Sequence, residues 1–172
     1  MTHTLAHEGR VFLNFRHYRF SDPHSHAFRW VDVKHLRFSG SPGDRELLAA
    51  LIGHEQFRDT YAGYGAHPEE TRHGSYWLAA ISPEAYEPVE TAESAAVLRA
   101  WAGQYGAVPA DLEADLRREV FDVLDAAARV FHLNGVGEED FHDWGGVHGE
   151  FHEFVSIDRA RGRITLLVAA DD

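Results

Sequence analysis

The sequence predicts an α+β fold in which a mostly antiparallel sheet packs against about three helices. Apolar and polar residues alternate with period two at both ends of the chain, which is typical of half-buried strands. Apolar residues between these regions recur every three or four positions, which indicates amphipathic helices. The expected order is β-β-α-loop-β-α-α-β-β, and runs of strands and helices of this kind favour an α+β layer fold. A length of 172 residues suits a single globular domain over 1–172.

An antiparallel hairpin followed by a helix is expected in the first third of the chain. Residues 11–20 and 26–38 alternate and are rich in aromatic residues, so each is predicted to be a strand. The turn signal Ser21-Asp22-Pro23 separates them. A helix is expected to begin after Ser41, because a serine can cap a helix and Pro42 suits its first position.

The central part of the chain predicts one loop, one short strand and two helices. Residues 59–75 contain glycine, proline and polar residues without a clear period and are interpreted as a loop. Residues 76–81 are apolar enough for a short buried strand. A helix is expected to begin at Thr91, and the longest helix is predicted over 109–133. Residues 150–170 then predict a C-terminal hairpin with its turn over 158–162.

The composition limits the chemistry and the compartment. The chain has no cysteine, which excludes disulfides, thiolate metal sites and cysteine nucleophiles. No apolar leader is visible at the N-terminus, and no apolar run reaches the ~20 residues of a membrane-spanning helix, so a cytoplasmic protein is expected. Lys34 is the single lysine beside fifteen arginines, which indicates a GC-rich bacterial genome.

The charge is unevenly distributed along the chain. The formal net charge is −12, and residues 61–172 hold 21 acidic residues against eight basic ones. An acidic surface of this kind repels nucleic acid and anionic membranes, so neither is an expected partner. A basic protein would be attracted to it, although acidity can also serve only solubility. The oligomeric state is left open.

The first functional hypothesis is a small acidic protein-binding module that neutralises a basic partner, as immunity or inhibitor proteins do. It is favoured because the chain lacks a nucleophile elbow, a phosphate-binding glycine loop and a dinucleotide fingerprint. The residues expected to contact the partner lie on the predicted helix 109–133 and in the loop before position 75. They are Glu113, Glu119, Asp122, Asp125, Tyr61, Tyr64, Glu69 and Glu70.

The alternative hypothesis is a metal-dependent enzyme, a hydrolase or oxygenase, built from histidines and carboxylates. Its candidate ligands are His24, His26, His142, His148 and Glu150. Two histidines at i and i+2 on a strand can meet one ion, which makes the pair His24 and His26 the best spaced. His148 and His152 cannot share an ion on a strand, because their Cα atoms would lie ~13 Å apart. No cofactor is expected unless this alternative holds, in which case it is a divalent transition metal.

Glu153 and His152 are the candidates for acid–base catalysis. Glu153 shares strand parity with Phe151, Val155 and Ile157, which would place its carboxylate in the core. Ionisable groups in such desolvated positions are candidates for general acid or base roles. Two alternatives remain open. Glu153 could lie at the rim of the sheet, or His152 could take the inward position.

Overall fold

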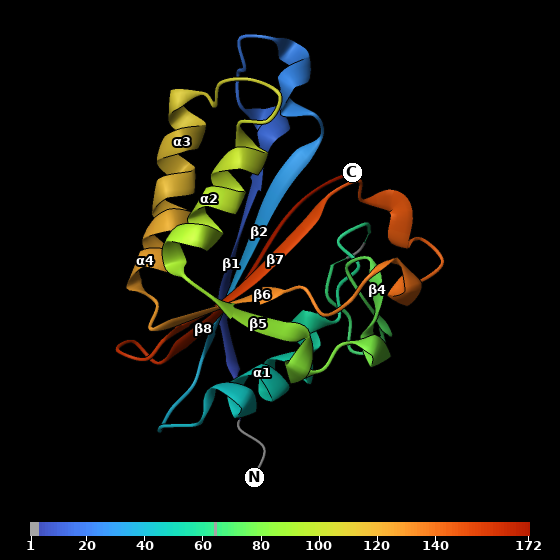
Figure 1. Ribbon diagram of the computed structural model, residues 1–172, viewed down its shortest axis with the longest axis vertical. Coiled ribbons are helices and arrows are strands. Elements are labelled where there is room, and N and C mark those ends of the chain that lie inside the picture. The colour runs from blue at the N-terminus through green and yellow to red at the C-terminus, as the bar shows by residue number, and fades with distance from the viewer. Residues whose placement is uncertain (1–3, 64) are drawn as a thin grey trace.

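The computed structural model describes residues 4–63 and 65–172, and over these ranges it confirms the predicted α+β class. One antiparallel sheet has the strand order β1-β2-β8-β7-β6-β5 (Figure 1). Its strands are β1 (Ala6–Asn14), β2 (Arg29–Arg37), β5 (Tyr86–Val89), β6 (Arg129–Leu133), β7 (Phe151–Asp158) and β8 (Arg163–Asp171). A separate small sheet pairs β3 (Arg72–His73) with β4 (Tyr76–Trp77).

The helices are α1 (Asp44–Ile52), α2 (Thr91–Ala102), α3 (Ala110–Leu116) and α4 (Asp122–Ala126). A π-helical segment, Arg117–Phe121, joins α3 to α4, so that the two form one continuous helix. No helix in the described ranges is both long enough and apolar enough to cross a membrane.

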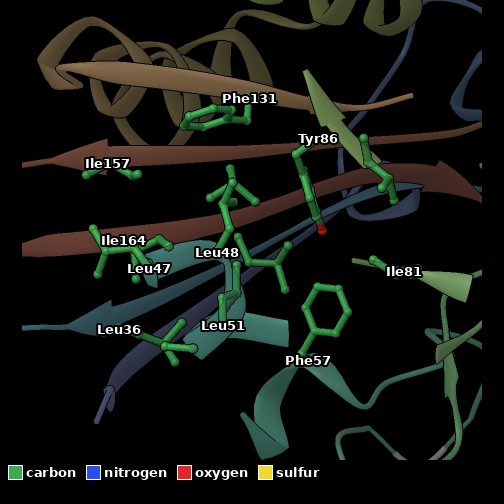
Figure 2. Close-up of a cluster of buried hydrophobic side chains, with 14 of the residues drawn as sticks. Leu36, Leu47, Leu48, Leu51, Phe57, Ile81, Tyr86, Phe131, Ile157 and Ile164 are labelled. Carbon is green, nitrogen blue, oxygen red and sulfur yellow. The ribbon is translucent and has the colours of Figure 1, made fainter. Parts of the chain in front are cut away.

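Other elements pack on both faces of the large sheet, and a separate hydrophobic cluster lies on each face. Helices α2, α3 and α4 pack on one face, against side chains such as Val33, Phe154 and Leu167. Helix α1 and the long loops cover the other face (Figure 1). Figure 2 shows Leu47 and Leu51 of α1 among the side chains of the central strands. Alternate residues of the central strands β2, β7 and β8 therefore enter different cores, and both faces of these strands are buried.

The predicted C-terminal hairpin is confirmed as β7 and β8, with the turn where the sequence places it. Gly162 has φ +64°, a left-handed conformation that favours glycine. A Cβ atom there would also lie 2.7 Å from the carbonyl oxygen of Phe38. The Phe38 N–H donates to the Gly162 carbonyl at 2.8 Å, so this turn also anchors the chain that leaves β2.

The N-terminal hairpin is confirmed as β1 and β2, but both strands begin and end elsewhere. Strand β1 begins at Ala6 and ends at Asn14, whose side chain accepts from the Arg16 N–H and starts a 3₁₀ turn. The predicted start of the second strand at residue 26 is wrong. His24 and His26 belong to the 3₁₀ helix Pro23–His26, which the Asp22 side chain caps. The i, i+2 strand geometry assumed for these two histidines is therefore absent.

Arg29 fixes this region to the helical layer. Its buried guanidinium donates to the carbonyls of Trp101 and Ala102 at the end of α2, at 2.5 and 2.9 Å. It also donates to the carbonyls of Ser25 and His26 at 2.6 and 3.1 Å. A cation is favoured at the C-terminal end of a helix, where carbonyl groups lack partners within the helix.

Two further predictions for the middle of the chain are wrong. The helix predicted over 109–133 ends at Ala126, and residues 129–133 form β6 between β5 and β7. The segment 76–81 contains only the short β4, followed by a 3₁₀ turn over 78–80. Strand β5 was not predicted. It contains Pro88, and it lies at the edge of the sheet, the position to which proline in a sheet is confined.

Truncating the core should separate buried from exposed positions in stability. Leu166 is fully buried in β8, so Leu166→Ala should lower the free energy of unfolding by about 2–5 kcal/mol through lost contacts and a cavity. Val147→Ala changes a side chain that is 46% exposed and should cost less than about 0.5 kcal/mol. Urea unfolding measures both values, and equal losses would contradict the assignment of the core.

Candidate functional site

Two loop segments come together on the α1 side of the sheet and form what we call the loop layer, residues 53–81 and 134–150 (Figure 1). The His142 N–H donates to the Ser75 carbonyl at 3.1 Å, and the His142 Nε2 lies 2.6 Å from the Gly74 carbonyl oxygen. Gly74 has φ +54° and lies against the ring of Phe151, so this position has no room for a side chain. The two loop segments are therefore joined by direct hydrogen bonds.

Lys34 anchors the first loop segment to the sheet. Its Nζ lies 2.8 Å from the Asp59 carboxylate and donates to the Gln56 carbonyl at 2.9 Å. The side chain is 1% exposed, and buried ammonium groups require such partners. Asp32 lies beside it, with Oδ2 3.9 Å from Lys34 Nζ, and its other oxygen accepts from Arg10. Burial raises the pKa of Asp32, and the positive charges of Lys34 and Arg10 oppose this shift.

His73, Glu153 and Tyr86 form a second buried chain of contacts. His73 Nδ1 lies 2.5 Å from the Phe57 carbonyl, and its Nε2 contacts one oxygen of Glu153. The Tyr86 hydroxyl donates to the other oxygen of Glu153. Both ends of the His73–Glu153 pair are fully buried. Glu153 thus takes the inward position that strand parity predicts, and the rim alternative is wrong.

Glu153 and Asp32 lie in one row across the sheet, because both pair with Val168 of β8. We call Asp32, Lys34, Asp59, His73, Tyr86 and Glu153 the polar cluster. It lies between the sheet and the loop layer and connects β2, β5 and β7 to the first loop segment. Buried polar groups of this kind specify one arrangement when all are paired, and they destabilise strongly when one partner is lost.

His148 holds three parts of the chain together. Its Nδ1 lies 2.6 Å from the Asp171 carbonyl oxygen, and its Nε2 lies 3.1 Å from that of Thr60. The ring also contacts Trp30 edge-on, at 5.7 Å between centroids. Both nitrogens of this candidate metal ligand are therefore occupied by the backbone. The same holds for His142, whose Nδ1 accepts from the Trp144 N–H at 3.0 Å.

The remaining candidate ligands and catalytic residues are dispersed. Glu150 and His152 contact each other, with 2.9 Å between Oε2 and Nε2, but His152 lies on the α2 side of the sheet and faces Trp101. Burial lowers the pKa of His26, and the nearby Arg16, His24 and Arg29 lower it further. The positive charges of Arg16 and Arg29 also oppose a metal cation there. Within residues 4–63 and 65–172, no group of three or more such side chains has the geometry to hold a metal ion.

An exposed aromatic surface lies on the loop layer. The Arg72 guanidinium lies over the rings of Trp77 and Trp144, at 5.5 and 4.5 Å from their centroids. The exposed fractions are 37% for Trp77, 58% for Trp144 and 46% for Val147. We call Arg72, Trp77, Trp144 and Val147 the tryptophan surface. Acidic residues of the same two segments accompany it: Glu69, Glu70, Glu138, Glu139, Asp140 and Asp143.

The sequence interpretation included Glu69 and Glu70 but not the two tryptophans. Glu69 is exposed, and Glu70 pairs with Arg72 at 3.4 Å. Tyr61 is partly buried, with its ring stacked on that of Trp30, and Tyr64 lies outside the described residues. One feature of the sequence could have indicated them. Each of two polar, glycine-rich segments contains a tryptophan, and a side chain of this size in a loop outside the core suggests a contact surface.

Arginines lie beside most of the helix acids that were predicted to contact a partner. Three of these acids pair with arginines: Glu113 with Arg99 at 2.9 Å, Glu119 with Arg118 at 3.1 Å and Asp122 with Arg117 at 3.9 Å. Asp125 is exposed on α4. These exposed ion pairs contribute little to stability, but they reduce the negative field of the helix.

The buried phenol of Tyr86 should make stability fall at alkaline pH. Burial raises its pKa well above the ordinary value, and the charge of Glu153 raises it further. The unfolded chain loses this proton near pH ~10, whereas the folded chain keeps it, so stability is present below pH ~10 and is lost as pH rises. The slope contributed by Tyr86 is about 1.4 kcal/mol per pH unit.

Tyr86→Phe should remove this contribution and make the alkaline slope of the unfolding free energy shallower. Tyr105→Phe is the matched control, because it removes the hydroxyl of a ring that is 53% exposed. Denaturant unfolding between pH 9 and about 11.5 measures the slopes. A Tyr86→Phe slope identical to that of the unsubstituted protein would show that the phenol is not held by the polar cluster.

Comparison with known proteins adds no relative from which a function could be transferred. No protein-family model matches this sequence, and no curated protein matches it.

Proposed function

We propose that this chain is a small acidic protein-binding module that covers a basic surface of a partner protein, in the manner of an immunity or inhibitor protein. The observation that carries the proposal is the tryptophan surface, where Arg72 stacks with the exposed rings of Trp77 and Trp144. Tryptophan and arginine are enriched among the residues that dominate binding energy at protein interfaces.

The charge of the loop layer supports a basic partner. Segments 53–81 and 134–150 together contain nine acidic residues and two arginines. Arg72 pairs with the Glu70 carboxylate, and Arg58 donates to the Glu70 carbonyl. An aromatic centre with an acidic rim favours a partner that offers lysine or arginine around an apolar patch, and complementary charge speeds the encounter.

The polar cluster supports the same proposal, because it holds the binding loops in place before a partner arrives. Lys34 fixes Asp59, and Glu153 fixes His73, next to Arg72. Loops that are already ordered lose less conformational entropy on binding, which improves affinity. The helix also carries a second acidic surface, formed by Glu113, Glu119, Asp122 and Asp125. We rank it below the loop layer as a contact surface, because three of these four acids pair with arginines.

The alternative, a metal-dependent enzyme based on histidines and carboxylates, has weaker support. Glu153 and His73 have no exposed side-chain surface, and a substrate would have to displace the loop layer to reach them. The candidate ligands His142 and His148 direct both ring nitrogens to the backbone. This alternative predicts that purified protein retains a stoichiometric transition metal, which elemental analysis measures.

Substitution of the tryptophan surface should abolish capture of the partner. The immobilised protein is incubated with an extract of its host at low and high salt, and bound proteins are identified by mass spectrometry. A basic protein should be retained at low salt and lost at high salt, because the Debye length falls from ~30 Å at 0.01 M to ~3 Å at 1 M. Trp77→Ala and Trp144→Ala should each weaken binding by about 2 kcal/mol, or roughly 30-fold.

Asp122→Arg/Asp125→Arg is the matched control, because it reverses two exposed charges on α4 and leaves the loops intact. It should retain the partner. If the helix variant loses the partner and the tryptophan variants keep it, the contact surface belongs on the helix. If every variant captures the same proteins equally well, both acidic surfaces serve solubility only and the proposal fails.

A further inference from the structure

Among the described residues, two arginines have no acidic partner, and both lie in the segment between β1 and β2. Of the fifteen arginines, eleven form ion pairs with carboxylates in the described part of the chain. Arg29 and Arg58 donate to backbone carbonyls. Arg16 and Arg19 remain, and within residues 4–63 and 65–172 neither guanidinium donates a hydrogen bond or contacts a carboxylate. In a chain with 28 acidic and 16 basic residues, such isolation is unexpected by composition.

Both arginines line one surface cavity of about 480 Å³ that is open to solvent. The segment that forms it, residues 15–28, lies beside α2 and α3, and is drawn in blue at the top of Figure 1. Two histidines and two aromatic rings complete most of the lining: His17, His26, Tyr18 and Phe20. The cavity therefore combines positive charge with an aromatic wall in a protein that is otherwise strongly acidic.

The fold holds this lining in place, and two nearby acids accept hydrogen bonds from the same segment. The Tyr18 hydroxyl donates to Asp115 of α3 at 2.5 Å, and the Asp22 carboxylate accepts from the His24 N–H at 3.0 Å. The Ser25 hydroxyl donates to the Tyr105 carbonyl at 2.8 Å and ties the segment to the turn that follows α2. His26 Nδ1 accepts from the Phe28 N–H at 2.9 Å, so a neutral His26 carries its hydrogen on Nε2.

We propose that this cavity binds a phosphate monoester whose substituent is apolar or aromatic. Guanidinium groups bind phosphate oxygens through two parallel hydrogen bonds, and Arg16 and Arg19 have donors free for this purpose. The Nε2–H of His26 and the imidazole of His17 add further donors. The half-buried Tyr18 and the 5% of Phe20 that is exposed line the cavity and offer the substituent apolar contact. This site is independent of the tryptophan surface, which lies on the loop layer.

The direct test is calorimetric titration of the whole chain with phenyl phosphate, with inorganic phosphate as the second ligand. Phenyl phosphate should bind at one site and more tightly than inorganic phosphate, because only the ester has a ring to place against the aromatic wall. Arg16→Gln and Arg19→Gln should each weaken phenyl phosphate binding at least about tenfold, since each removes a charge-assisted contact. The NMR signals of the Arg16 and Arg19 side-chain N–H groups should shift during the titration.

Arg45→Gln is the matched control. It removes an exposed arginine that pairs with Glu84 far from this cavity along the chain, and it should bind phenyl phosphate like the unsubstituted protein. The proposal is overturned if phenyl phosphate shows no saturable binding up to about 10 mM. It is also overturned if Arg45→Gln weakens binding as much as Arg16→Gln does. Equal affinity for inorganic phosphate would refute the role of the aromatic wall. Circular dichroism of each variant verifies the fold.

Discussion

The contact between Glu153 and His73 under the loop layer is the interaction on which the rest of this structure depends. Glu153 is the third residue of β7. Its carboxylate contacts His73 of the loop layer and accepts from the Tyr86 hydroxyl of β5, so it joins two strands of the sheet to the loops. Lys34 of β2 and Asp59 of the first loop segment form a second buried contact between the sheet and the loop layer. Charges buried in this way are costly unless they are paired. The loops must therefore stay where Asp59 meets Lys34 and His73 meets Glu153.

Local patterns predict the C-terminal part of the fold well. The sequence predicts the hairpin of β7 and β8 together with its turn, and strand parity places Glu153 inward. The pattern fails where tertiary pairing decides. Residues 129–133 continue the helical spacing of the preceding segment, yet they form β6 because the sheet offers neighbours on both sides. Strand β5 contains Pro88, a residue that argues against a strand in the sequence, and β5 forms by pairing with β6.

The candidate site was much less predictable, because it is made by residues far apart in the sequence. Arg72 stacks with Trp77 five positions away and with Trp144 from another loop, and no local spacing signals the second contact. The charge along the sequence also does not show which acids are paired. Three of the four predicted helix acids pair with arginines, whereas segment 134–150 contains five acids and no lysine or arginine.

Native-state hydrogen exchange in Glu153→Gln tests the central role of this carboxylate most directly. The Gly74 N–H donates to the Asp59 carbonyl at 2.8 Å and the His142 N–H to the Ser75 carbonyl at 3.1 Å, so both amides report on the loop layer. We expect the substitution to accelerate their exchange at least about tenfold more than that of amides in β2 and β8, because the loops then open locally. Equal acceleration of loop and sheet amides, or none at the loops, would contradict the role of Glu153.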